Sequence, residues 1–183
     1  GCRNYINKIW NASRFVLMNC EGKKVKDIQD CKLGVQDKWI ISKLNQTVRK
    51  VTVNMEKYEI GLACGELQEF VWSDFCDWYI EIAKIRLNGE CATAKATVKA
   101  VLVYVMSNTL KLLHPFMPFI TEEIWQTLPH DGDSIMISEW PVFTDELSFK
   151  ADENEMERVM TAIKAVRNRR AEMNVPPSKK AKI

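Results

Sequence analysis

The sequence predicts an all-α protein that folds as an antiparallel helical bundle, with a short irregular or extended excursion near residues 129–149. Apolar residues recur with helical spacing in six segments, and the connections between most of these segments are short. Short connections make neighbouring helices antiparallel. The chain has 183 residues, of which 46% are hydrophobic, so it is long enough to bury the core of one ordinary domain.

The first helix, residues 3–20, has two unlike faces. Bases offer flat rings for stacking and polar edges for amides, so a surface of cations, amides and one ring suits RNA. The alternative is that the ring, Phe15, only contacts a neighbouring helix. The broad side expected to face the core carries Cys2, Tyr5, Ile6, Ile9, Trp10, Ala12, Ser13, Val16, Leu17 and Cys20. Around Phe15 on the opposite side lie Asn4, Asn7, Lys8, Asn11, Arg14 and Met18.

Two long helices are expected next. One is capped by Asp37 and runs to about Glu56. The other covers Ile60 to Leu87 and ends at Asn88-Gly89, a common stop signal. One side of this second helix carries Leu67, Phe70, Val71, Phe75, Trp78, Ile82 and Ile85, which we expect to be buried.

The fourth helix, from about Thr93 to Leu113, is apolar nearly all round and is expected to be the most buried. Its most apolar run is short and bounded by lysines, which favours a core helix over a membrane span. Pro115 and Pro118 interrupt the helical pattern, and a short fifth helix is predicted to open at Thr121.

The excursion that follows contains turn signals and a short run, 134–138, that is expected to be extended. A last helix runs from about Asp152 to Met173. We divide the chain into a bundle, 1–175, and a basic extended tail, 176–183. The apolar side of the last helix carries Met156, Val159, Met160, Ile163 and Val166.

Charge is unevenly distributed along the chain. The formal net charge is +2, yet residues 1–26 carry +5, residues 27–155 carry −9 and residues 156–183 carry +6. Such a chain can present a local cationic surface without being a basic protein. In the last helix Arg167 and Arg170 are three residues apart, so we predict that their guanidinium groups can grip phosphates together.

No catalytic or metal-binding set is visible. The six cysteines never approach Cys-x-x-Cys spacing, and two histidines cannot complete a zinc site. The seven glycines form no phosphate-binding loop. His114 precedes a proline at a helix end, where a structural role is expected. The thiol usage is typical of a reducing cytoplasm.

Three stretches resemble the C-terminal region of the valyl-tRNA synthetases, which are class I aminoacyl-tRNA synthetases. They lie at 3–16, 72–81 and 114–125, and the third is shared with the isoleucine, leucine and methionine relatives. Residues 170–177, Arg-Ala-Glu-Met-Asn-Val-Pro-Pro, together with the first stretch resemble the valine enzymes in particular. Arg169 departs from the family pattern, which has an apolar residue there.

The resemblance implies an excised anticodon-binding bundle that selects tRNA and is itself non-catalytic. ATP and valine would be handled by a catalytic domain elsewhere in the parent ligase, so no cofactor is expected here. The expected partners are valine tRNA, through its anticodon loop, and the rest of the synthetase chain, with no membrane involved. The alternative function is a helical scaffold that docks a protein and has no nucleic-acid role.

By matching position, the resemblance assigns anticodon-loop contacts on the first helix and a neighbouring wall on the third. Phe15 is predicted to stack on a base, Asn11 to contact a base edge, and Lys8 and Arg14 to contact phosphates or base acceptors. The complete set of predicted tRNA-binding residues is Asn4, Lys8, Asn11, Arg14, Phe15, Ile80, Glu81, Arg167 and Arg170. Trp72, Phe75 and Trp78 are predicted to be core.

Overall fold

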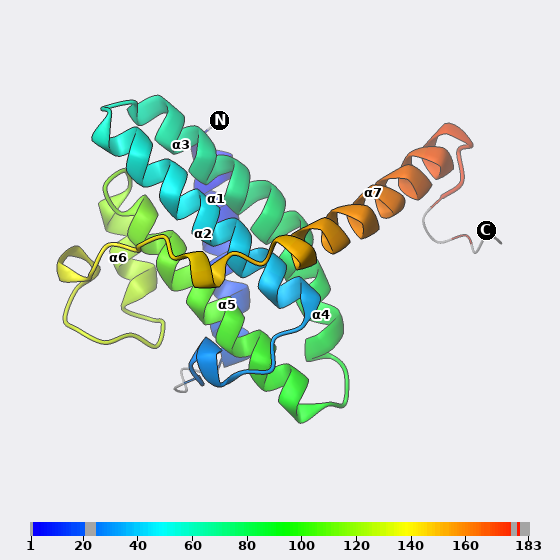
Figure 1. The fold of residues 1–183 in the computed structure, drawn as a ribbon, viewed down its shortest axis with the longest axis horizontal. Helices are drawn as coiled ribbons and strands as arrows, with labels where there is room; N and C mark the ends of the chain where they lie inside the picture. Colours follow the sequence, from blue (N-terminus) through cyan, green and yellow to red (C-terminus); the bar gives the residue numbers. More distant parts are fainter. Residues whose placement is uncertain (1, 21–24, 177–178, 180–183) are drawn as a thin grey trace.

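In the structure, a computed structural model that describes residues 2–20, 25–176 and 179, all regular elements of these residues are helical (Figure 1). The all-α prediction is confirmed. The α-helices are α1 Cys2–Cys20, α2 Val35–Glu56, α3 Ile60–Glu69, α4 Ile80–Leu87, α5 Ala92–Leu113, α6 Pro118–Trp125 and α7 Lys150–Glu172. A π-helical segment, Phe70–Tyr79, joins α3 to α4, and short 3-10 turns cover Ile28–Asp30, Ile135–Ile137 and Asp145–Leu147.

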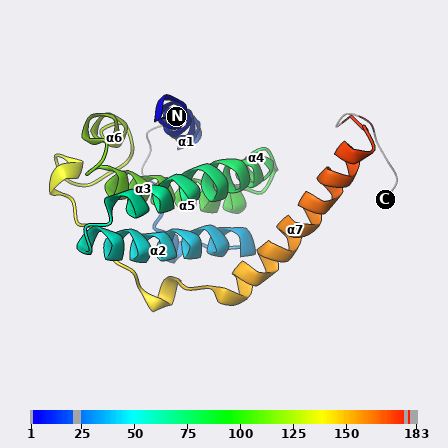
Figure 2. The same ribbon diagram turned by 90° about the horizontal axis from the view of Figure 1, so that it is seen from above.

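The bundle has three layers. Figure 2 shows α1 on one side of a layer formed by α3, α4 and α5, with α2 on the other side. α5 packs against both α1 and α2. By length and composition α5 could cross a membrane, but 67% of its most apolar stretch is buried inside the bundle. It therefore has the burial of a core helix, as the sequence predicts.

The long helix from Ile60 to Leu87 changes its hydrogen-bonding pattern in the middle. The N–H of Ile80 donates to the carbonyl of Phe75, so the donor and the acceptor are five residues apart instead of the four residues of an α-helix. A π-helical turn contains more residues than an α-helical turn. The side chains after the π-helical segment therefore face other directions than those calculated for a continuous α-helix with 100° per residue. The core-facing residues are consequently Phe70, Val71, Phe75, Tyr79, Ile80 and Ala83.

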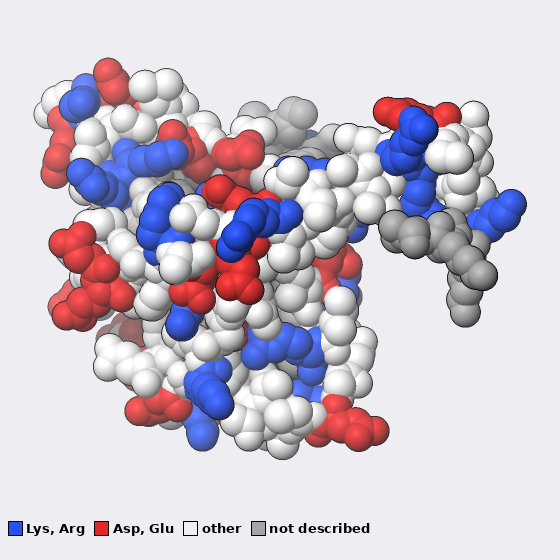
Figure 3. Space-filling view, turned by 45° about the vertical axis from the view of Figure 1, so that its right-hand side comes forward, with Lys and Arg blue, Asp and Glu red and all other residues white. Residues whose placement is uncertain are grey.

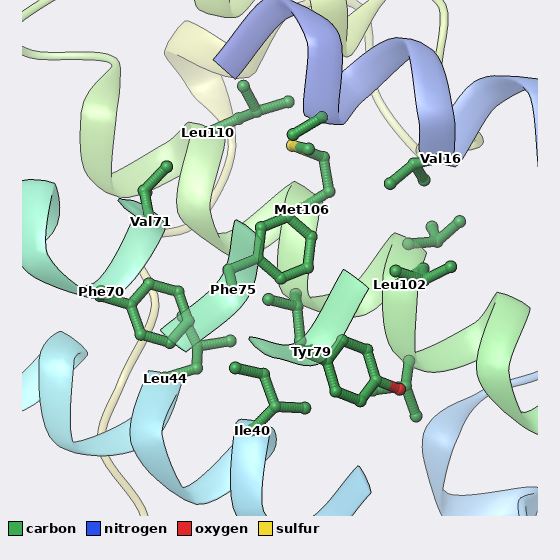
Figure 4. Packing of buried hydrophobic residues seen from close by; sticks show 14 of the residues in the cluster. Val16, Ile40, Leu44, Phe70, Val71, Phe75, Tyr79, Leu102, Met106 and Leu110 are labelled. Atoms are coloured by element: carbon green, nitrogen blue, oxygen red, sulfur yellow. The ribbon is translucent and has the colours of Figure 1, made fainter. Parts of the chain in front are cut away.

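This rotation explains three errors in the predicted core. Ile85 is 75% exposed, and Trp78 and Ile82 are only half-buried. The wheel that predicted their burial assumed an uninterrupted α-helix. Figure 4 shows Phe75 and Tyr79 of the π-helical segment packed with Met106 and Leu102 of α5 and Val16 of α1.

Two predicted boundaries are wrong for local reasons. α6 begins at Pro118 and not at Thr121, because the first helical position needs no N–H donor and suits proline. The run 134–138 is not extended: it contains the 3-10 turn Ile135–Ile137, whose first N–H groups are capped by Ser134. The excursion at 129–149 is otherwise irregular, as predicted.

The core side of α1 is narrower than predicted. Ile9, Ala12 and Val16 are buried, whereas Ile6 and Trp10 are 38% and 42% exposed. α1 lies at the edge of the bundle, where its main contacts are with α5 and the π-helical segment. Two neighbours cover a narrower strip of helix than the broad apolar side that the sequence suggests.

α7 packs on α2 through its first half and then projects away from the bundle (Figures 1 and 2). Met156 is buried, but Val159, Ile163 and Val166 are 36–46% exposed, so only the first half of the predicted apolar side packs on the bundle. Most of the predicted tail lies outside the described residues, and the domain division at 175 stays a prediction.

A buried carboxylate joins the start of α2 to the long helix. Asp37, fully buried, caps the start of α2 as predicted, but from the third helical position and not from the N-cap position, which is Gly34: its side chain accepts a 2.9 Å hydrogen bond from the N–H of Gly34. Both of its oxygens also contact Nη1 of Arg86, at 2.6 and 2.8 Å. The hydroxyl of Tyr79, the last π-helical residue, donates to Asp37 at 2.9 Å. Burial, and then the charge of Asp37, raise the pKa of Tyr79, which keeps this donor protonated.

Replacing Arg86 with Met should destabilise the protein by about 3–5 kcal/mol, because it leaves the buried charge of Asp37 without its cation. Urea unfolding measures this change. Lys50→Met is the control, since Lys50 pairs with Glu66 on the surface at 2.9 Å, and its loss should cost less than about 1 kcal/mol. Similar losses for the two variants would contradict the anchoring role of Arg86.

Asp74 should make stability depend on pH in the opposite sense to most carboxylates. Burial raises its pKa from 3.8 to about 6, although Lys43 of α2 and Lys164 of α7 oppose this shift. A raised carboxyl pKa favours the folded state at low pH, and this contribution is lost as the pH rises through about 6. Asp74→Asn should therefore raise the urea midpoint at about pH 7.5 and leave it nearly unchanged at about pH 4. A lower midpoint at the higher pH would mean that the lysines stabilise the charged form.

Candidate nucleic-acid interface

An open groove of about 550 Å³ lies between α1 and the long helix. We call it the α1 groove. One wall is a stripe of α1 residues, and the other is a stripe of the long helix with every fourth residue facing in. The α1 wall consists of Asn4, Asn7, Lys8, Asn11, Ala12 and Phe15, and the opposite wall consists of Trp72, Cys76, Ile80 and Lys84.

The predicted α1 residues largely come together in this groove. Asn4, Lys8, Asn11 and Phe15 all line it, while Arg14 is exposed but does not line it. Phe15 is half-buried: its ring packs against the core and also borders the groove. Both interpretations of this ring, contact with a neighbouring helix and a surface for a base, are therefore compatible with its position.

The opposite wall is only partly as predicted. Ile80 is 6% exposed and contributes to the groove lining, whereas Glu81 is exposed and does not line the groove. Trp72, predicted to be core, is half-buried and borders the groove. Trp72 and Lys84 were not predicted to lie on this wall, although their spacing of four residues along the chain, shared with Cys76 and Ile80, is the spacing that places side chains on one face of a helix.

Each aromatic ring in the groove has a lysine beside it, and each lysine has a carboxylate partner. Nζ of Lys8 lies 4.1 Å from the centre of the Trp72 ring and 2.6 Å from Oδ1 of Asp77. Nζ of Lys84 lies 5.8 Å from the centre of the Phe15 ring.

The partner of Lys84 is Glu81, whose Oε1 lies 2.6 Å from Nζ. Glu81 thus acts on the groove through a lysine. The two lysines come from opposite walls, Lys8 from α1 and Lys84 from α4.

The two predicted arginines of α7 contact different parts of their own chain. Nη2 of Arg170 donates to the carbonyls of Pro176 and Lys179, each at 2.8 Å, and so holds the chain that follows α7. The guanidinium of Arg167 lies 5.5 Å from the centre of the Trp78 ring, beside Lys164 at 5.7 Å. Neither arginine lines the α1 groove.

The face that carries α7 is not uniformly basic. Figure 3 shows lysines and arginines interspersed with acidic side chains over this face. Two of these lysines pair with α7 itself: Lys38 with Asp152 at 3.6 Å and Lys43 with Glu157 at 3.4 Å. The groove, with its rings, amides and two lysines, is therefore the better candidate for RNA.

No metal-binding cluster competes with this interpretation in the part of the chain that the structure describes. There, no group of three or more His, Cys, Asp or Glu side chains could hold a metal ion. His114 has a structural position: its Nδ1 lies 2.8 Å from the hydroxyl of Thr121, which ties the end of α5 to α6.

Comparison with known proteins agrees with the fold and with the kind of site. Residues 37–183 match the family model described as the anticodon-binding domain of tRNA ligase. A valine–tRNA ligase of Bacillus cereus (strain ATCC 10987) is 51% identical over 181 residues, which is 98% of this chain and 20% of the relative. A valine–tRNA ligase of Listeria innocua is 54% identical over 177 residues, again 20% of the relative.

A similar solved structure is the agnB2 LeuRS of Agrobacterium radiobacter K84, in a ternary complex with tRNA and LeuAMS. Its TM-score is 0.60 at 21% identity, over 81% of this chain and 17% of that chain, and this likeness concerns the fold alone. The present chain spans about a fifth of the length of the curated relatives that it matches. By its match over residues 37–183, the chain belongs to the family of anticodon-binding domains of tRNA ligases.

Proposed function

We propose that the α1 groove binds the anticodon loop of valine tRNA for a valine–tRNA ligase. Two observations support the proposal: the relatives named valine–tRNA ligase that are more than 50% identical, and the groove itself. The single observation on which the proposal depends is that four of the contacts predicted on α1 line one open groove. The aromatic rings of this groove are Phe15, which is one of the four, and Trp72. A base needs a ring to stack on and amides at its edges, and both are present here.

Five of the lining residues have a role in this proposal. Phe15 stacks on a base, and the amide of Asn11, one turn earlier on α1, contacts a base edge. Lys8 binds a phosphate or a base acceptor, and Ile80 forms an apolar floor. Asn4 offers a second amide at the far end of the groove.

The remaining predicted residues lie outside the groove lining. Arg14 is exposed next to Phe15 and would attract phosphates at the rim of the α1 groove. Glu81 acts by holding Lys84. Arg167 and Arg170, which bind their own chain's Trp78 and C-terminal carbonyls, are left out of the interface.

The parent ligase would join valine to its tRNA with ATP, and the catalytic work would lie outside these residues. This region would then select tRNA without a cofactor of its own, in the cytoplasm, and act together with the rest of the ligase chain. The alternative, a helical scaffold for a protein partner, requires no preference for tRNA.

Phe15→Ala should weaken binding of tRNA with a valine anticodon by about 1–3 kcal/mol, because stacking on that ring is lost. Filter binding of valine tRNA and of an anticodon-swapped tRNA measures both affinity and selectivity. The matched control is Phe119→Ala, since Phe119 is a 91% exposed phenyl group on α6, away from the groove lining.

Wild type should prefer the valine anticodon, Phe119→Ala should behave as wild type, and Phe15→Ala should lose affinity and preference. Equal affinity of all three proteins for both tRNAs would contradict the proposal and favour the scaffold.

A further inference from the structure

The Trp72 ring has no role in the proposed base contacts, although its surroundings resemble those of the Phe15 ring. At both ends an aromatic ring borders the groove and an ammonium group from the opposite wall lies near the ring. Indole is the larger ring and, like every aromatic side chain, offers a face on which a base can stack.

The two ends are too far apart to serve one base. Lys8, which contacts Trp72, and Phe15 are seven residues apart on α1, which corresponds to about 10 Å along the helix. Bases stacked in a strand are spaced by about 3.4 Å. A base on Phe15 therefore leaves the Trp72 ring free for another nucleotide, and Asn11 lies between Lys8 and Phe15 along α1.

In the structure the Trp72 ring is covered. Lys8 lies 4.1 Å from the ring centre, and its ammonium is held by Asp77, which is about half exposed. An ion pair that solvent reaches contributes little, so a phosphate can compete for the lysine at small cost. RNA entering the groove would offer that phosphate and, at the same time, a base for the ring.

Building on the proposed function, we propose that Trp72 is a second base-stacking platform of the α1 groove. In the free protein Lys8 covers the platform and Asp77 holds Lys8 there. On binding, Lys8 leaves the ring for a phosphate, and a base takes its place. Asp77 thus lowers affinity and reduces the binding of RNA that supplies a phosphate without a base that fits.

The platform is tested with Trp72→Leu and Trp72→Phe in binding assays with an anticodon stem–loop RNA. Leucine keeps an apolar side chain in the core contact but removes the ring, so affinity should fall by at least about fivefold. Phenylalanine should retain most of the affinity. Urea unfolding shows whether either variant is folded, and Phe15→Ala is measured alongside.

The outcomes separate this inference from the proposed function. Wild-type affinity of Trp72→Leu together with a loss in Phe15→Ala overturns the second platform alone. Wild-type affinity of both variants overturns the proposed function first. An equal loss in Trp72→Leu and Trp72→Phe would also contradict stacking, because a phenyl ring can replace an indole in that role.

The restraint on Lys8 is tested with Asp77→Asn, which should bind the stem–loop about two- to fivefold more tightly. The plot of the logarithm of the binding constant against the logarithm of the salt concentration should become steeper by up to about 0.7, as expected for one more effective phosphate contact. The control Glu66→Gln removes the same charge from a lysine-paired carboxylate of the same long helix, outside the groove lining, and should change neither quantity. Unchanged or weaker binding of Asp77→Asn, or an equal gain in Glu66→Gln, would overturn the restraint.

Discussion

The rotational position of the long helix, Ile60 to Leu87, is the constraint on which the groove depends. Its π-helical segment turns Phe75 and Tyr79 into the core and leaves Trp72 and Cys76 on the side that faces α1. The buried Asp37 holds this rotation through Tyr79 at the end of the segment and Arg86 one helix further on. Tyr79 and Arg86 thus connect the buried carboxylate to the helix that forms one wall of the groove.

The groove also shows how a chain with a net charge of only +2 can offer cations to RNA. Lys8 and Lys84 are concentrated at one site, but Asp77 and Glu81 partly neutralise both. Such neutralisation weakens the sequence-independent attraction to phosphate and leaves more of the selectivity to rings and amides. In the proposed anticodon site, this balance favours specificity over raw affinity.

Much of the fold follows from the sequence, because hydrophobic period and helix-stop residues fix where most helices lie. The polar side of α1 was also predictable: Asn4, Asn11 and Phe15 follow from a simple wheel. The wall opposite was not. A wheel cannot foresee that the turns between Phe70 and Tyr79 widen, and it placed Ile85 on the core side. Trp72 was assigned to the core for another reason, because aromatic side chains on bundle helices are usually buried.

Contacts between distant segments were equally beyond the sequence. The spacing of Arg167 and Arg170 suggested a joint grip on phosphates, but it contained no information about Trp78 or the carbonyl of Pro176, which they contact. The exposure of the apolar side in the outer half of α7 was also not predictable. Periodicity indicates an amphipathic helix, but it does not show how far along that helix the neighbouring helices extend.

The central claim is that the anticodon loop binds between α1 and the long helix. A map of NMR chemical-shift changes on adding a valine anticodon stem–loop tests it most directly, because it reports on every face at once. The account predicts the largest changes at the amides and rings that line the groove, including Asn11, Phe15 and the indole of Trp72. Changes concentrated on α7 around Arg167, with the α1 groove unaffected, would contradict it.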